Sequence, residues 1–327
     1  MTMEENLFPE RTDLQEFREI LARLKAEIGK VIVGQEQMIE LLIAGMLADG
    51  HILIEGVPGV AKTLTAKLLA RTISVGFSRI QFTPDLMPGD VIGTSVFNPK
   101  ELLFQFRQGP IFSHIILIDE INRAPAKTQA ALFEVMEERQ VTVDGQTMKM
   151  QQPFLVLATQ NPVEQEGTYH LPEAQLDRFL FKINVDYPNA EEEFQVVSKH
   201  HLSNGNLLEE LVGPVLNASV IASLRKQVSA IHVEEKLIRF IVAVVSSTRE
   251  HKSIYLGASP RASIGILQSS KAIAAMNGRD FVVPEDILQV TPAVLRHRLV
   301  LTPEKEMEGG TTDDVIREVI QTVEIPR

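Results

Sequence analysis

The stretch from His51 to Thr65, HILIEGVPGVAKTLT, decides the fold. Its first part, HILIE (51–55), is a short apolar run of the kind found in a strand covered on both faces. The following GVPGVAKT (56–63) matches the pattern G-x-x-x-x-G-K-[ST], except that Ala61 stands at the second glycine. A strand, a glycine-bearing loop and the first turn of a helix in this order predict a phosphate-binding loop.

Each residue type in this loop has a chemical reason. Gly56 and Gly59 let backbone N–H groups close around a polyphosphate, and the start of the next helix adds donors and a positive dipole end. Lys62 is expected to reach the β- and γ-phosphates, and the Thr63 hydroxyl to bind magnesium. For Ala61 we expect a negative φ, because it directly precedes the helical Lys62. An ordinary glycine-rich turn that happens to contain Lys-Thr is the alternative.

A second apolar run, HIILIDE (114–120), ends in an acidic pair. Ligands of open α/β sheets bind beyond the carboxyl ends of the strands, so this pair is expected to face the phosphate loop. Asp119 is expected to hold magnesium, and Glu120 to orient and polarise the attacking water. A strand that ends in solvated acids is the alternative, which the presence of Lys62 and Thr63 disfavours.

Short apolar runs alternate with helical patterns up to Tyr187 and predict a parallel sheet with helices on both faces. The expected strands are 51–55, 78–82, 114–120, 154–159 and 179–185. Asn161 follows the fourth of them, where an amide can position a water against a γ-phosphate. An Asn-Pro turn is the alternative for that residue.

Two β-hairpins are expected to interrupt this alternation. The first joins 91–97 to 102–106 through an Asn-Pro-Lys turn. The second turns at Asp144-Gly145, a strong hairpin signal, and places Thr142 opposite Thr147.

From residue 188 to 327 helical patterns dominate and predict a second, all-helical domain, with 284–290 and 292–301 as separate helices. Within it, Ser259-Pro260-Arg261 marks a helix start. A cation in the first turn faces the positive end of the helix dipole, so Arg261 calls for an anion nearby, and a bound phosphate would supply one. An exposed arginine tolerated at small cost is the alternative.

The bulk composition narrows the class of protein. The chain has 327 residues, enough for about two domains. It has no cysteine, which fits a reducing compartment. Its acidic start lacks a secretory signal and no apolar run approaches the ~18 residues of a membrane span, so we expect a cytoplasmic protein. A net charge of −11 disfavours nucleic acid and favours protein or small-molecule partners.

Taken together, these motifs resemble the MoxR family of AAA+ ATPases over essentially the whole chain. The matching segments are GVPGVAKT (56–63), IDEINRAPAKTQ (118–129), ATQNP (158–162), LPEAQLDRF (171–179) and GASPRA (257–262). The resemblance includes Ala61, which belongs to that family's version of the loop. It implies an AAA+ core over 1–187 and a helical lid over 188–327. The first hairpin then matches the helix-2 insertion (about 85–110) and the second the pre-sensor-1 insertion (about 140–152).

The resemblance also implies roles for single residues. Asn161 matches sensor 1, Arg261 matches sensor 2, and Arg178 matches an arginine finger that reaches the neighbouring subunit's γ-phosphate. Arg123 is the alternative finger, or a residue of the subunit interface. Expected contacts to ATP are Val33, Gly34, Gln35, Gly56, Val57, Pro58, Gly59, Val60, Ala61, Lys62, Thr63, Leu64, Asp119 and Arg261. Of these, Val33 to Gln35 would cover the adenine, and a plain helix break is their alternative.

The family resemblance implies a magnesium-dependent ATPase that works as a homo-oligomer, with a hexameric ring as the expectation. Its turnover would drive chaperone-like maturation, activation or metal or cofactor insertion of client proteins, with a von Willebrand factor A domain protein as a partner. Three alternatives stay open: a DNA-remodelling motor, a magnesium-chelatase-like motor subunit, and a scaffold that binds ATP without turnover. Lys149 is the one cation of the second hairpin that could meet a DNA phosphate.

Overall fold

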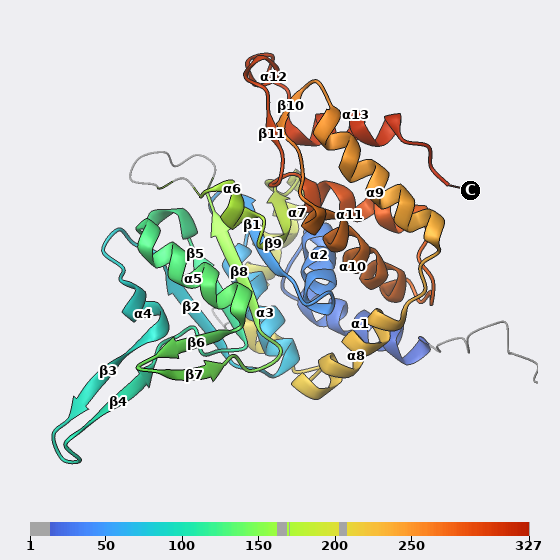
Figure 1. Cartoon of the computed structure of the whole chain (residues 1–327). Coiled ribbons are helices and arrows are strands. Elements are labelled where there is room, and N and C mark those ends of the chain that lie inside the picture. Colours follow the sequence, from blue (N-terminus) through green and yellow to red (C-terminus); the bar gives the residue numbers. More distant parts are fainter. Residues whose placement is uncertain (1–13, 162–168, 170, 203–207, 327) are drawn as a thin grey trace, which may run out of the picture.

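The computed structural model describes residues 14–161, 169, 171–202 and 208–326. Within them, a five-stranded parallel sheet with strand order β2-β5-β8-β1-β9 forms the centre of the molecule (Figure 1). The strands are β1 (His51–Gly56), β2 (Phe77–Gln81), β5 (Ile115–Asp119), β8 (Leu155–Gln160) and β9 (Phe179–Val185). The predicted five-stranded α/β core is confirmed.

Side chains of β1 alternate between two cores on the two faces of this sheet. Ile52 and Ile54 pack into one core, and Leu53 between them packs into the other. Because successive side chains of a strand point to opposite faces, a strand that is apolar at every position needs helices on both sides. The covering helices are α1 (Gln15–Gly29), α2 (Glu36–Leu47) and α3 (Lys62–Ile73) on the first face, and α4 (Pro88–Ile92) and α5 (Ala126–Glu138) on the second.

Two antiparallel hairpins project from the second face, at the lower left of Figure 1. They are β3 (Gly93–Asn98) with β4 (Leu103–Gln108), and β6 (Gln140–Val143) with β7 (Gln146–Lys149). In the second hairpin Thr142 lies opposite Thr147, with their hydroxyl oxygens 3.0 Å apart, as predicted. The first hairpin begins two residues later than expected. Val91 and Ile92 end the short helix α4, whose N-terminus is closed by a bond of 2.8 Å from the Met87 N–H to the Asp90 carboxylate.

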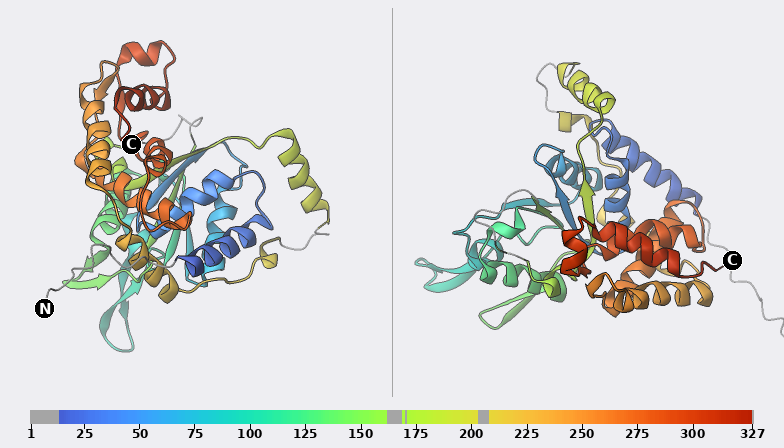
Figure 2. Two further views of the ribbon diagram at one scale, coloured as in Figure 1. Left: turned by 90° about the vertical axis from the view of Figure 1, so that its right-hand side faces the viewer. Right: turned by 90° about the horizontal axis from the view of Figure 1, so that it is seen from above.

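The C-terminal part of the chain is helical, and α10 packs against α2 while α11 packs against β9. Helices α8 to α13 gather along one side of the sheet (Figure 1), and α7 stands apart from α9 to α13 (Figure 2). The helices are α6 (Glu173–Leu176), α7 (Ala190–Leu202), α8 (Ala218–Ala230), α9 (Glu235–Glu250), α10 (Pro260–Met276), α11 (Pro284–Leu295), α12 (Pro303–Met307) and α13 (Thr312–Thr322). A small ladder pairs β10 (Ile254–Leu256) with β11 (Val300–Leu301).

The expected break at Pro292 was wrong, because α11 continues through it. A proline inside a helix removes one backbone hydrogen bond and crowds the preceding turn. Val290 and Val294 on either side of it are fully buried, so tertiary packing keeps the helix intact. Among the described residues, none of the helices is both long and apolar enough to cross a membrane.

Candidate functional site

The loop between β1 and α3 has the shape that the sequence predicts, with one difference in its backbone. Lys62 is the first residue of α3, and its Nζ donates a hydrogen bond to the carbonyl oxygen of Gly56 at 2.5 Å. A Cβ on Gly56 would lie 2.5 Å from the carbonyl oxygen of Val185, and Gly59 has a φ of +88°. Both positions therefore need glycine, for space in one case and for backbone conformation in the other.

Ala61 has a φ of +59°, so the expectation of a negative φ was wrong. It is the N-cap of α3, and the chain turns through the left-handed region there before it enters the helix. An alanine in that region costs about 1 kcal/mol more than a glycine, because its Cβ crowds the following carbonyl. Ala61 therefore adopts the left-handed backbone conformation that favours glycine, and its backbone is strained.

The carboxylate of Asp119 lies beside the Thr63 hydroxyl at the end of β5. One oxygen of Asp119, Oδ1, accepts hydrogen bonds from Thr63 Oγ1 at 3.4 Å and from Thr159 Oγ1 at 3.2 Å. The side chain is 8% exposed, so a cation that reaches it is shielded from bulk water. A hydroxyl next to a buried carboxylate is a hard oxygen donor set, and this chemistry fits Mg²⁺.

Two side chains of β2 contact the acidic pair, and the sequence did not single them out. Arg79 Nε donates to Asp119 Oδ2 at 2.6 Å, and Gln81 Nε2 donates to Glu120 Oε2 at 2.6 Å. Residues two apart in a strand share a face, and β2 pairs directly with β5. The spacing of two polar residues in β2 was the available signal. It becomes informative only once β2 is known to lie next to β5.

Glu120 is held from three directions. Its backbone is left-handed, with a φ of +57°, and its N–H donates to Thr159 Oγ1 at 3.0 Å. Its carboxylate pairs with Arg123 Nε at 3.1 Å in addition to Gln81. Thr159 thus touches both acids and fixes their spacing. Arg123, the alternative trans-acting arginine, contacts an acid of its own chain here.

One cavity, of about 230 Å³, brings these groups together. It is lined by the loop, by β2, and by the carboxyl ends of β5 and β8. The predicted site residues that line it are Pro58, Gly59, Lys62, Thr63, Asp119, Glu120 and Asn161. Pro162, which ends the ATQNP motif, lies outside the described residues. The loop pattern and the expected strand ends therefore named residues that line one common cavity.

The other predicted nucleotide contacts do not line this cavity. Val60 is buried, and the partly buried side chains of Val57, Ala61 and Leu64 pack against the apolar core. Gln35 Nε2 donates to the carbonyl oxygen of Asp186 at 3.5 Å, which places the segment Val33-Gly34-Gln35 beside the end of β9.

Arg178 and Arg261 meet on one carboxylate, that of Glu137 near the end of α5. Arg178 Nη1 donates to Glu137 Oε2 at 3.1 Å and to the carbonyl oxygen of Phe133 at 3.1 Å. Arg261 Nη2 donates to Glu137 Oε1. The sequence suggested a phosphate as the anion that offsets Arg261. In the structure Glu137 supplies that anion, and neither arginine lines the phosphate cavity of its own chain.

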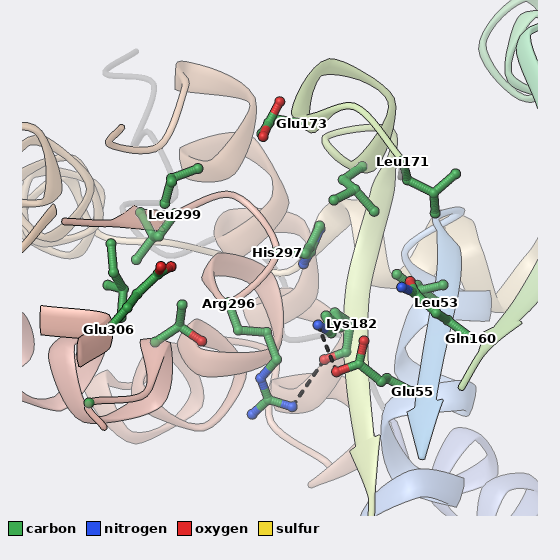
Figure 3. A pocket seen from close by; sticks show the side chains of 15 residues that line it. Leu53, Glu55, Gln160, Leu171, Glu173, Lys182, Arg296, His297, Leu299 and Glu306 are labelled. Atoms are coloured by element: carbon green, nitrogen blue, oxygen red, sulfur yellow. Dashed lines mark hydrogen bonds and ion pairs between the residues drawn. The ribbon is translucent and has the colours of Figure 1, made fainter. Parts of the chain in front are cut away.

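A second and larger cavity, of about 400 Å³, lies between the ends of β1, β8 and β9 and the segment that follows α11 (Figure 3). The Lys182 ammonium pairs with the Glu55 carboxylate at 2.9 Å, and Arg296 Nη1 donates to the carbonyl oxygen of Lys182 at 3.1 Å. None of the predicted site residues lines it. Because Lys182 is paired with Glu55 and Arg296 with Asp313, the cavity does not compete with the loop as a phosphate site.

Comparison with known proteins agrees with this geometry. Residues 51–181 match the family described as "ATPase family associated with various cellular activities (AAA)", and residues 246–319 match an AAA lid domain. Chaperone MoxR1 of Mycobacterium tuberculosis is 45% identical over 316 residues, covering 94% of this chain and 82% of the relative. Protein MoxR of Methylorubrum extorquens is 31% identical over 337 residues, covering 96% and 97%.

A solved structure extends the likeness to three dimensions. A candidate ATPase from Cytophaga hutchinsonii superimposes with a TM-score of 0.89 at 44% identity, covering 96% of this chain and 97% of that one. The loop, the acidic pair and these likenesses define an AAA+ ATPase, which binds and hydrolyses ATP. Within that class, the chain belongs to the MoxR family.

Proposed function

We propose that the groups of the phosphate cavity divide the work of ATP hydrolysis among them. Lys62 binds the β- and γ-phosphates, and the carboxylate of Glu120 orients the attacking water, with Asn161 as a second hydrogen-bond partner for that water. Thr63 and Asp119 hold Mg²⁺, which when bound neutralises charge on the phosphates. The contact between Thr63 and Asp119 in the same cavity as Lys62 carries this proposal.

Arg178 serves the ATP bound by a neighbouring chain, and we assign Arg261, for which the sequence suggested only a nucleotide contact, to that same neighbouring site because it bonds to Glu137 beside Arg178. Both side chains bond to Glu137, and neither lines the phosphate cavity of its own chain. An arginine that stabilises the γ-phosphate in trans requires an assembly in which each chain supplies it to the next. We propose a homo-oligomeric ring, hexameric as the family resemblance implies.

Val33, Gly34 and Gln35 cover the adenine of the bound ATP. The chain divides into an AAA+ core and a lid between residues 187 and 188.

The turnover of this ring drives the maturation or activation of client proteins, including the insertion of a metal or cofactor. A relative is named a chaperone, and the tip of the β3–β4 hairpin offers an apolar surface. Leu102, Leu103 and Phe104 at this tip are 73%, 62% and 72% exposed. Such a tip fits protein better than DNA, whose phosphates attract cations. We propose a von Willebrand factor A domain protein as a partner, and the cytoplasm, which supplies ATP, as the compartment.

A trap variant tests this proposal. Glu120→Gln removes the carboxylate that acts on water and keeps the groups that bind ATP, so its complexes with clients should persist. We expect the variant to retain a client from nuclease-treated lysate with ATP and to release it without nucleotide. Lys62→Ala, which cannot bind ATP tightly, is the control that should retain nothing.

Replacing Leu102, Leu103 and Phe104 by serine in the trap variant should abolish the capture, since the proposed client surface is then polar. If this polar variant captures the same proteins as the parent, the hairpin is not the client surface. Retention of DNA without any client protein, once nuclease is omitted, would contradict the chaperone function and favour a motor on nucleic acid.

A further inference from the structure

Asp177 immediately precedes Arg178, and the C-terminal helices hold both oxygens of its carboxylate. Oδ1 accepts a hydrogen bond from Arg298 Nε at 2.6 Å, and Oδ2 accepts one from Ser259 Oγ at 3.0 Å. Ser259 is the N-cap of α10, yet its hydroxyl makes no capping bond to that helix. Because an N-cap oxygen normally accepts from the first turn, this serine contributes to a tertiary contact instead.

Arg298 is buried, with 3% of its side chain exposed, and all its nitrogens bond to the segment around Arg178 or to α11. Nη2 donates to the carbonyl oxygens of Asp177 at 3.1 Å and Phe179 at 2.6 Å, while Nη1 donates to Leu180 at 3.1 Å and also to Val294. A buried guanidinium is tolerated only when its donors are satisfied. Here the satisfied donors fix the backbone on both sides of Arg178.

The two residues before Arg298 make the same kind of contact. Arg296 Nη1 donates to the carbonyl oxygen of Lys182 at 3.1 Å (Figure 3), and His297 Nε2 lies 2.9 Å from the carbonyl oxygen of Phe179. Three consecutive residues after α11 are therefore bonded to the first part of β9. A shift of this part of the lid would move the start of β9 with it.

These bonds tie Arg178 and Arg261 together twice. Their side chains share the Glu137 carboxylate. Their neighbours in the chain are also linked, because the side chain of Ser259, two residues before Arg261, donates to that of Asp177, one residue before Arg178. Two links at different points restrict both translation and rotation of one arginine relative to the other.

We propose that Arg298 is a positioning residue for ATP hydrolysis. By holding Asp177 against Ser259, it presents Arg178 and Arg261 to the neighbouring chain as one unit. This inference rests on the proposed function, in which both arginines act in trans. It predicts that loosening Arg298 impairs the rate at the neighbour's site and leaves ATP binding by the chain that carries Arg298 intact.

The first test compares two arginine-to-lysine variants of the full-length protein. Arg298→Lys keeps the charge and loses the planar fork that makes several bonds at once. We expect kcat to fall by roughly 10- to 100-fold, as for a small misplacement of a catalytic group, with KM for ATP within about twofold of wild type. Arg279→Lys is the matched control, because Arg279 makes a two-bond pair with Asp286 in the lid and does not contact the 177–180 segment. An equal kcat for the two variants would overturn the inference.

Mixing experiments separate positioning from simple loss of structure. A Glu120→Gln chain cannot hydrolyse its own ATP but still offers an intact Arg178 to its neighbour. Mixing it with Arg298→Lys chains should restore activity, as it should for Arg178→Ala chains, whereas mixing Arg298→Lys with Arg178→Ala should not. If Arg178→Ala is restored and Arg298→Lys is not, Arg298 does not act through Arg178. If mixing restores the activity of neither Arg178→Ala nor Arg298→Lys chains, the active site is not shared between chains, and this inference is overturned together with the proposed function.

A milder pair of variants carries the test if Arg298→Lys does not fold. Ser259→Ala removes one bond to Asp177 without removing a helix cap, and Ser259→Thr keeps the hydroxyl. We expect Ser259→Ala to lower kcat about threefold or more at unchanged KM and to be restored by Glu120→Gln chains, and Ser259→Thr to retain kcat near wild type. Wild-type kcat in Ser259→Ala would contradict the proposed link.

Discussion

The phosphate cavity draws most of its groups from strand ends that lie side by side in one sheet, whereas the arginine pair on Glu137 joins α5, α10 and the turn before β9. Thr63, Asp119 and Thr159 meet because β1, β5 and β8 end at the same edge. Arg178 and Arg261 reach Glu137 across 41 and 124 residues of sequence. The first site is fixed by the sheet and by the helix that follows β1, and the second also needs the lid, which supplies Arg261.

The largest expected effect on kcat comes from removing an arginine of the pair on Glu137. Arg178→Ala should lower kcat by roughly 10³- to 10⁵-fold, as loss of an arginine finger does in related phosphoryl transfer, with little change in ATP affinity. Phosphate release measured over a range of protein concentrations checks this, because wild-type activity per chain should rise with concentration. Arg123→Ala is the companion variant. Because Arg123 pairs with Glu120 of its own chain, only a loss that mixing with Glu120→Gln chains restores would identify Arg123 as the trans-acting residue.

A smaller effect is expected inside the cavity. Arg79 donates to the Asp119 carboxylate that we propose as a magnesium ligand, so Arg79→Ala should lower the Mg²⁺ concentration for half-maximal ATPase activity by severalfold. Magnesium titrations of wild type and variant measure this directly. Arg239→Ala removes an exposed arginine of α9 and should leave the magnesium dependence unchanged. An unchanged magnesium requirement in Arg79→Ala would show that Arg79 does not compete for the site.

The contrast between the two regions also explains what the sequence could predict. The loop, the acidic pair and Asn161 were located because each follows an apolar run, and parallel strands end at one edge. Arg79 and Gln81 were missed because their role depends on the pairing of β2 with β5. Glu137 was missed because only tertiary packing brings it to two arginines. The prediction of a negative φ for Ala61 was wrong for a local reason. The turn into α3 needs a left-handed conformation whatever residue occupies that position.

The free energy of unfolding should depend on pH because of His51, a buried histidine that belongs neither to the phosphate cavity nor to the arginine pair. His51 accepts a bond from the Val156 N–H at Nδ1 and donates from Nε2 to the Met136 carbonyl. Burial, helped by the Arg139 cation, lowers the pKa of His51 to about 3 from its usual 6.5. This stabilising contribution is complete above pH 6.5 and is lost as the pH falls from 6.5 towards 3, because only the unfolded chain takes up the proton. The slope is about 1.4 kcal/mol per pH unit.

Urea unfolding at pH 7.5 and pH 5.0 measures this dependence. The His51→Gln variant, which cannot be protonated at that position, should lose about 2 kcal/mol less of its unfolding free energy than wild type over that interval. Equal losses in the two proteins would mean that His51 does not bind a proton on unfolding.

The smallest effect concerns Ala61. Ala61→Gly should raise the free energy of unfolding by up to about 1 kcal/mol, because glycine adopts the left-handed conformation without a Cβ clash. Ala130→Gly, at an exposed position inside α5, is the control and should lower it by about 1 kcal/mol. The opposite signs separate backbone strain in the loop from the general effect of glycine. A loss of stability in both variants would contradict the strained conformation of Ala61.

The most direct test of the proposed mechanism is ATP binding and single-turnover hydrolysis by Glu120→Gln. Binding relies on the loop and on Thr63 and Asp119, while hydrolysis relies on the Glu120 carboxylate. We expect ATP affinity within about threefold of wild type and a hydrolysis rate lower by roughly 10²- to 10⁴-fold, the contribution of a general base. Hydrolysis at the wild-type rate would contradict the role of Glu120 and, with it, the assignment of the cavity as the catalytic centre.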